Sequence, residues 1–207
     1  MNKVCMRLAL PLVLLGSAPA WAQPGLPTPG PGEHLEDFAR RVAVPPASRE
    51  SSLVTPVTWN GQPFLFVDYS IVQPIPGGEQ EEDRELVALE KMPGGGYRQR
   101  KVTTGEEEGG TAKIEAIAFA NADKDPAKEL IVLLSWPVQH ADVSGTLYEV
   151  RIFDDVPPDA AQVTYLKSLS AHFNRHSCEC DRDGEKPEHA DFKTVAAIKR
   201  ELAKMGF

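Results

Sequence analysis

Residues 111–153 constrain the fold of this chain most, because apolar residues recur there with the two-residue period of β-strands. The middle of this block contains five consecutive apolar residues, from Leu130 to Leu134, which is typical of a strand buried on both faces. Short connections join the strands and favour an antiparallel meander. The predicted strands of this block are 111–120, 129–136 and 145–155.

Further strands are predicted before and after this block. Residues 63–72 alternate clearly, with Leu65, Val67, Tyr69 and Ile71 on one face and Phe64 and Phe66 on the other. Residues 85–91 form a second candidate. Residues 97–104 are polar on both faces and predict an exposed edge strand. Residues 163–173 fit either a strand or a helix, and we expect a strand for their first half.

Helical spacing of apolar residues is found near both ends of the chain. A short N-terminal helix is predicted by the stripe Leu35, Phe38, Ala39 and Val42. A C-terminal amphipathic helix over 192–205 is predicted by Phe192, Val195, Ile198, Leu202 and Met205, with Asp191 as its N-cap and Gly206 as its stop. The patterns together predict an α+β fold, in which these two helices accompany an antiparallel β-sheet.

The N-terminal residues predict export from the cytoplasm. Residues 1–22 carry two basic side chains before a short apolar stretch and end in Ala-Trp-Ala, the pattern of a secretory signal peptide, although a buried N-terminal helix would also fit. We expect cleavage near Ala22 and a periplasmic or secreted protein. Residues 23–33 are rich in Pro and Gly and predict a flexible leader, which leaves 34–207 as a single domain.

The composition argues against a nucleic-acid partner and against a transmembrane segment. The chain has 22 Lys and Arg against 30 Asp and Glu, a formal net charge of −8, which argues against nucleic acid as a partner. No uninterrupted apolar stretch is long enough to predict a transmembrane segment.

An acidic segment between two predicted strands is the strongest candidate site. In the sequence NADKDPAKE, the residues Asn121, Asp123, Asp125 and Glu129 occupy positions 1, 3, 5 and 9, so alternate side chains can direct oxygen atoms at one centre. The carbonyl of Ala127 could add another oxygen. Hard divalent cations such as Ca²⁺ prefer oxygen ligands of this kind. The alternative is an ordinary turn in which Asn121 and Asp123 bond to their own backbone.

The segment around this loop, residues 114–134, resembles the calcium loop of integrin-type FG-GAP repeats. The resemblance rests on the run N-A-D-K-D-P-A-K-E-L-I-V, in which oxygen-bearing residues precede a buried strand. It implies a β-hairpin whose loop binds calcium through Asn121, Asp123, Asp125 and Glu129. The chain has Pro126 where the family has Gly, so the loop must bend differently, because proline cannot adopt a positive φ.

Residues 171–189 concentrate histidine and cysteine. Three interpretations are open for Cys178 and Cys180: a local disulfide, which an oxidising compartment favours, exposed thiols or an intermolecular bridge, and a soft-metal site for copper(I) or zinc. His172, His176 and His189 would supply the further ligands of such a metal site.

No recognised catalytic motif is found in the sequence. His140, Asp142 and Ser144 alternate, but side chains two apart on a strand are too far apart for a Ser–His hydrogen bond. The sequence therefore favours a non-catalytic binding protein, stabilised by calcium, that acts on a protein partner, which the acidic charge suggests is basic. Periplasmic immunity or inhibitor proteins share this profile. The alternative is a redox or soft-metal-handling protein that uses residues 172–189.

Overall fold

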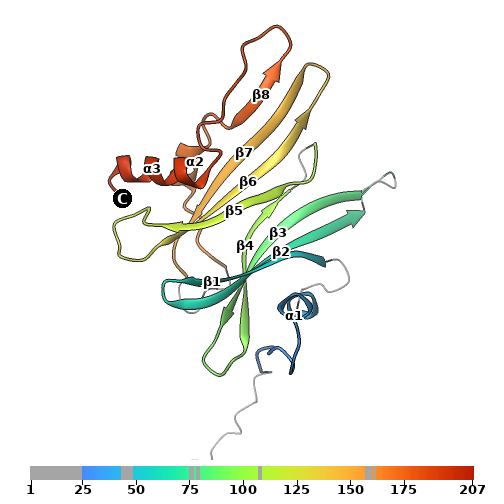
Figure 1. Ribbon diagram of the computed structural model, residues 1–207, viewed down its shortest axis with the longest axis vertical. Helices are drawn as coiled ribbons and strands as arrows, with labels where there is room; N and C mark the ends of the chain where they lie inside the picture. Colours follow the sequence, from blue (N-terminus) through green and yellow to red (C-terminus); the bar gives the residue numbers. More distant parts are fainter. Residues whose placement is uncertain are drawn as a thin grey trace, which may run out of the picture.

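The computed structural model describes residues 25–42, 49–74, 77, 80–106, 109–156, 160 and 162–207. The predicted signal peptide lies outside these residues. The described chain forms two four-stranded antiparallel sheets (Figure 1). The first sheet consists of β1 (Arg49–Trp59), β2 (Gln62–Pro74), β3 (Gln80–Lys91) and β4 (Tyr97–Gly105), in this order. The second consists of β5 (Lys113–Ala120), β6 (Glu129–Gln139), β7 (Val143–Phe153) and β8 (Cys178–Arg182).

Both sheets are meanders in which every strand pairs with its neighbour in the sequence. The helices of the described chain are α1 (Leu35–Val42), α2 (Lys167–Phe173) and α3 (Val195–Met205). The predicted antiparallel meander and the two terminal helices are thereby confirmed. The division of the strands into two sheets was not predicted.

The alternation of side chains along the strands builds an apolar core between the two sheets. Trp59, Phe64 and Phe66 of the first sheet form an aromatic cluster with Phe119 of the second. The buried residues of this inner core are Trp59, Phe64, Phe66, Leu86, Ala88, Val102, Ala112, Leu130, Val132, Leu134, Trp136, Phe153 and Val163.

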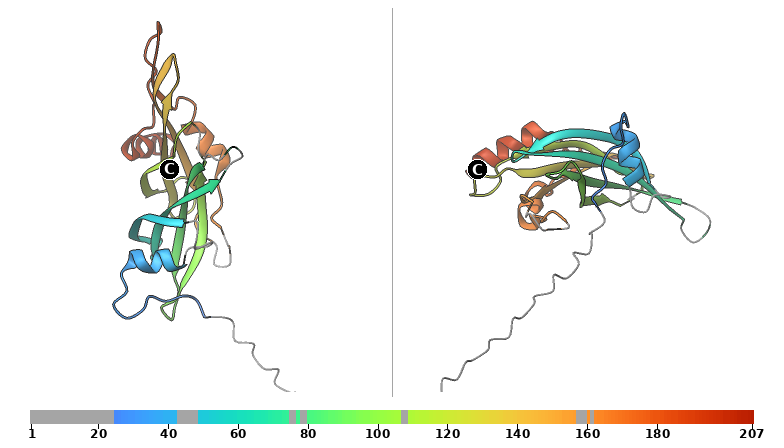
Figure 2. Two further views of the ribbon diagram at one scale, coloured as in Figure 1. Left: turned by 90° about the vertical axis from the view of Figure 1, so that its right-hand side faces the viewer. Right: turned by 90° about the horizontal axis from the view of Figure 1, so that it is seen from below.

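The outer face of each sheet is covered by helices (Figures 1 and 2). On the first sheet, Phe38 and Ala39 of α1 pack with Leu65, Val67, Tyr69, Val87, Leu89 and Tyr97. On the second, Phe173 of α2 and Ile198 and Leu202 of α3 pack with Ala122, Ile131, Leu133, Val150 and Ile152. This arrangement explains why β2 and β6 are apolar on both faces, since each strand faces the inner core and a helix. Within the described chain, the helices are all too short or too polar to cross a membrane.

The residues before α1 contain no regular secondary structure but contact the first sheet and α1. Within residues 25–34, the carbonyl of Pro27 accepts a hydrogen bond from the Tyr97 N–H at 2.9 Å. The Arg41 side chain binds the carbonyl of Thr28 and pairs with Glu33, which holds the pKa of the Glu33 carboxyl at about 2.

The strand predicted for the first half of 163–173 is wrong. Gln162 and Tyr165 make isolated β-bridges, to Lys101 and Phe153 respectively, and α2 begins at Lys167. The helix is favoured because Ser170, fully buried, accepts a hydrogen bond from the Ile152 N–H at 2.9 Å and so joins α2 to β7.

The predicted cap of the C-terminal helix is also wrong in its position. The side chain of Thr194 accepts the N–H of Ala197, whereas Asp191 pairs with His176. Gly206 ends the helix in the left-handed conformation, as predicted.

Strand β4 lies at the edge of the first sheet, as predicted, but its side chains are not exposed on both faces. Tyr97, Arg100 and Val102 are buried. Arg100 is hidden because its guanidinium pairs with Glu90 of β3 at 2.6 Å and donates to the carbonyl of Ala160. The predicted exposure of residues 97–104 on both faces is therefore wrong.

Candidate cation site at one end of the second sheet

The antiparallel register of the second sheet brings three chain segments together at one end. Ala120, the last residue of β5, pairs with Glu129, the first residue of β6. Leu130 then pairs with Phe153, the last residue of β7. The β5–β6 loop and the residues that follow β7 therefore leave the sheet side by side.

Three of the predicted ligands converge in this loop. Carboxylate oxygens of Asp123, Asp125 and Glu129 lie within 4.8 Å of one another. This spacing matches the span of two calcium–oxygen bonds of about 2.4 Å, so one cation could contact all three groups. Asn121 is exposed at the start of the loop, and its role as a ligand stays a prediction.

The loop is shaped by its own acidic side chains. The carboxylate of Asp123 accepts the N–H of Asp125 at 2.8 Å, and the carboxylate of Asp125 accepts the N–H of Ala127 at 2.7 Å. These turns bend the chain at Pro126 without a glycine. Each bond uses only one oxygen of a carboxylate, so the turns formed by Asp123 and Asp125 are compatible with the predicted cation site.

Glu129 is the most unusual residue of the cluster, because its carboxylate is fully buried. One oxygen accepts the Ala122 N–H, and the other oxygen, Oε1, has no hydrogen-bond partner. Burial raises the pKa of the Glu129 carboxyl; the Ala122 N–H lowers it, and the charges of Asp123 and Asp125 raise it further. A buried, unpaired carboxylate is costly, and a bound cation would offset this cost.

Two further carboxylates extend the cluster, and the sequence analysis did not place them in the site. Oxygens of Asp154 and Asp155 lie within 4.8 Å of each other and of Asp125. Burial raises the pKa of the Asp155 carboxyl, and the charges of Asp154, Asp125 and Asp123 raise it further. No sequence spacing relates residues 154 and 155 to the loop; only the pairing of β6 with β7 does.

The turn between β1 and β2 supports the far side of the loop. Asn60 and Gly61 both have positive φ angles, 47° and 81°, as a tight hairpin turn requires. The Asn60 side chain accepts the N–H of Lys128 at 2.9 Å and donates to its carbonyl at 3.1 Å. The indole N–H of Trp59 donates to the same carbonyl. The first sheet therefore fixes the peptide that precedes Glu129.

Replacement of Asn60 by glycine tests this support without straining the turn, because glycine accepts a positive φ. We expect Asn60→Gly to lower the free energy of unfolding by about 1–2 kcal/mol, since two hydrogen bonds to Lys128 are lost. Urea denaturation measures the change. The matched control is Lys124→Gly, which also introduces a glycine but at an exposed position of the β5–β6 loop. A loss for Asn60→Gly no larger than that of the control would contradict the role of Asn60.

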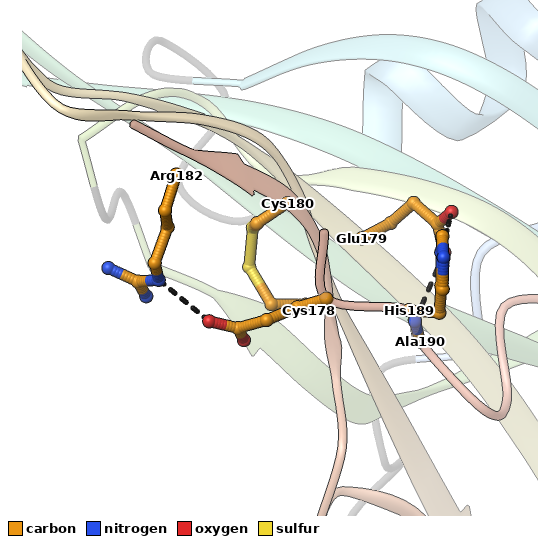
Figure 3. Close-up of a disulfide and its surroundings, with 7 residues drawn as sticks. Cys178, Glu179, Cys180, Arg182, His189 and Ala190 are labelled. Atoms are coloured by element: carbon orange, nitrogen blue, oxygen red, sulfur yellow. Dashed lines mark hydrogen bonds and ion pairs between the residues drawn. A yellow bond between two sulfur atoms is a disulfide. The ribbon is translucent and has the colours of Figure 1, made fainter. Parts of the chain in front are cut away.

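Cys178 and Cys180 are joined by a disulfide within β8 (Figure 3). Between them, Glu179 accepts hydrogen bonds from the Ala190 N–H and pairs with His189 and Lys193. These contacts, with Lys193 the largest, lower the pKa of the Glu179 carboxyl to about 2. Gly145 of β7 faces this disulfide, and a Cβ atom there would lie 2.7 Å from Cys180 Cα. Strand β8, which the sequence analysis missed, therefore requires glycine at 145.

The histidines near the disulfide are each engaged by a carboxylate. His172 contacts Glu201 at 3.2 Å, His176 contacts Asp191 at 3.0 Å, and His189 contacts Glu179 at 3.0 Å. Among the residues that the structure describes, the clusters able to hold a metal contain only Asp and Glu. His140, Asp142 and Ser144 are exposed around the β6–β7 turn.

Comparison of the chain with protein families, with curated proteins and with solved structures gives no match. The resemblance of residues 114–134 to FG-GAP calcium loops therefore stays a prediction. The function has to be argued from the geometry of the carboxylate cluster.

Proposed function

We propose that this chain is an exported, non-catalytic binding protein whose β5–β6 loop binds calcium. The proposal depends on the Oε1 atom of Glu129, which is buried and has no hydrogen-bond partner. The carboxylate of Glu129 lies close to those of Asp123 and Asp125. Without a bound cation, the Glu129 carboxyl would have to take up a proton or stay charged next to two like charges, with no partner for one of its oxygens.

Calcium fits this cluster better than other common cations do. The grouped side chains offer only carboxylate oxygen, whereas zinc and copper favour nitrogen and sulfur ligands. Asp125 is exposed and Asp123 is half-buried, so water can complete the six to eight oxygen ligands that calcium takes. Magnesium demands a stricter octahedral geometry and gives up its water reluctantly, which makes it the weaker candidate.

In this binding protein, calcium would stabilise the structure of the β5–β6 loop. A bound calcium ion would offset most of the charge of the three carboxylates and hold the loop in one conformation against the hairpin of Trp59 and Asn60. The loop would then form part of a rigid surface for a protein partner. The net charge of −8 supports a basic partner, because opposite charges steer association.

Calcium titration of the purified protein tests this proposal. We expect binding heat and a rise in the melting temperature at about 1 mM calcium, the range of extracellular calcium sites. The double variant Asp123→Asn with Asp125→Asn should show neither. The matched control, Asp181→Asn, changes an exposed acid in β8 and should bind like the wild type. Absence of binding by the wild type would remove the proposal.

The alternative, a protein that handles soft metals or thiols through residues 172–189, has less support. Its two cysteines are bonded to each other, and its three histidines contact carboxylates. Neither set of side chains gathers into a cluster that could hold a metal among the described residues.

A further inference from the structure

Asp154 and Asp155 follow β7 directly, and the fold brings them to the calcium loop although 25 or more positions of chain separate them from it in sequence. Leu130 pairs with Phe153. Glu129, which precedes Leu130, and Asp154, which follows Phe153, therefore lie at the same end of the β6–β7 pair. Asp125 lies close to both groups: its carboxylate has an oxygen within 4.8 Å of those of Asp123 and Glu129, and of those of Asp154 and Asp155.

We propose that Asp154 and Asp155 are ligands of the cation site, which therefore joins the β5–β6 loop to the segment that follows β7. This inference rests on the proposed calcium site and adds two ligands that neither the loop sequence nor its resemblance to FG-GAP repeats includes. Asp125 belongs to both groups of carboxylates. Because a carboxylate has two oxygens, Asp125 can bind a cation together with residues of either group.

The charge of the cluster supports this extension. Four carboxylates lie near that of Asp125, and the described contacts of these five groups include no Lys or Arg pairing with them. Within this group, the buried oxygen Oε1 of Glu129 also has no hydrogen-bond partner. Like charges so close together repel one another unless cations or protons neutralise them.

The position of Asp155 gives the additional ligands a structural consequence. Asp155 lines a cavity of about 170 Å³ together with Trp59, Asn60 and Glu90 of the first sheet. Further along the chain, Val163 is buried in the inner core and Gln162 pairs with Lys101 of β4. A cation bound to Asp125 and Asp155 would fix the residues that directly follow β7 beside this cavity.

Calorimetric titration with calcium chloride tests the inference on the purified protein. We expect the double variant Asp154→Asn with Asp155→Asn to bind calcium at least about tenfold more weakly than the wild type, because two charged ligands are lost. The matched control Asp142→Asn, an exposed acid at the β6–β7 turn, should bind like the wild type. An unchanged affinity in the double variant, with binding lost in the Asp123 and Asp125 variant, would overturn this inference and leave the calcium loop intact.

A second measurement does not depend on any variant. Hydrogen exchange of the wild-type protein should show that calcium slows exchange both in 121–129 and in the residues after β7, 154–156. Protection confined to the loop would overturn the inference, whereas absence of any effect, together with absence of binding heat, would remove the calcium site as a whole.

Discussion

The Glu129→Gln protein should gain no stability from calcium, whereas the wild type should gain about 2.7 kcal/mol at a calcium concentration of 100 times its Kd. The physical reason is that Glu129 is the buried ligand: its carboxylate is fully inaccessible and keeps one oxygen unpaired. An amide binds calcium far more weakly than a carboxylate in this position, because it carries no charge. Chemical denaturation with and without calcium measures the difference.

The same variant should behave differently once calcium is removed by a chelator. A glutamine avoids the cost of a buried charge, and its NH₂ group can donate to the neighbouring carboxylates of Asp123 and Asp125. We therefore expect Glu129→Gln to be at least as stable as the wild type in chelator. The matched control is Glu185→Gln, at an exposed turn. A variant that keeps the full calcium effect would show that Glu129 is not a ligand.

Replacement of Arg100 by alanine should lower the free energy of unfolding by about 3–5 kcal/mol, the cost of removing one partner of a buried ion pair. Arg100 is completely buried in β4, and two of its nitrogens bind the same oxygen of Glu90, at 2.6 and 2.9 Å. Its remaining terminal nitrogen donates to the carbonyl of Ala160. The alanine variant leaves Glu90 without this charge partner in a largely buried position.

A second variant tests whether the charge of Glu90, left without its partner, causes this loss. Glu90→Leu with Arg100→Met removes both charges and keeps apolar volume, so it should recover most of the lost stability. Arg200→Ala, on the exposed face of α3, should change stability by less than about 0.5 kcal/mol. Equal losses in the single and the double variant would show that the unpaired charge of Glu90 does not determine the effect.

Much of the secondary structure could be predicted because it depends on local periodicity. The alternation of Leu65, Val67 and Tyr69 against Phe64 and Phe66 defines the two faces of β2, and the structure packs them into different cores. The apolar stripe at Phe38 and Ala39 likewise buries α1. These elements follow from the sequence because the period of a strand or helix decides which side chains share a face.

Other elements could not be predicted because distant contacts decide them. The ambiguous segment 163–173 became helical where Ser170 binds the backbone of β7. Strand β8 is short and polar, and its pairing with β7 depends on Gly145 and the Cys178–Cys180 segment. Asn60 and Gly61 carried a recognisable hairpin signal that the sequence analysis did not use.

By itself, the sequence determined most of the strands, the terminal helices and the alternate spacing of Asp123, Asp125 and Glu129, because these depend on neighbours within a few residues. Only the tertiary structure decided that the strands divide into two facing sheets, that Glu129 is buried, and that Asp154 and Asp155 join the loop. These features arise from the pairing of β6 with β7 and the packing of the two sheets, which bring together residues with no fixed separation along the chain.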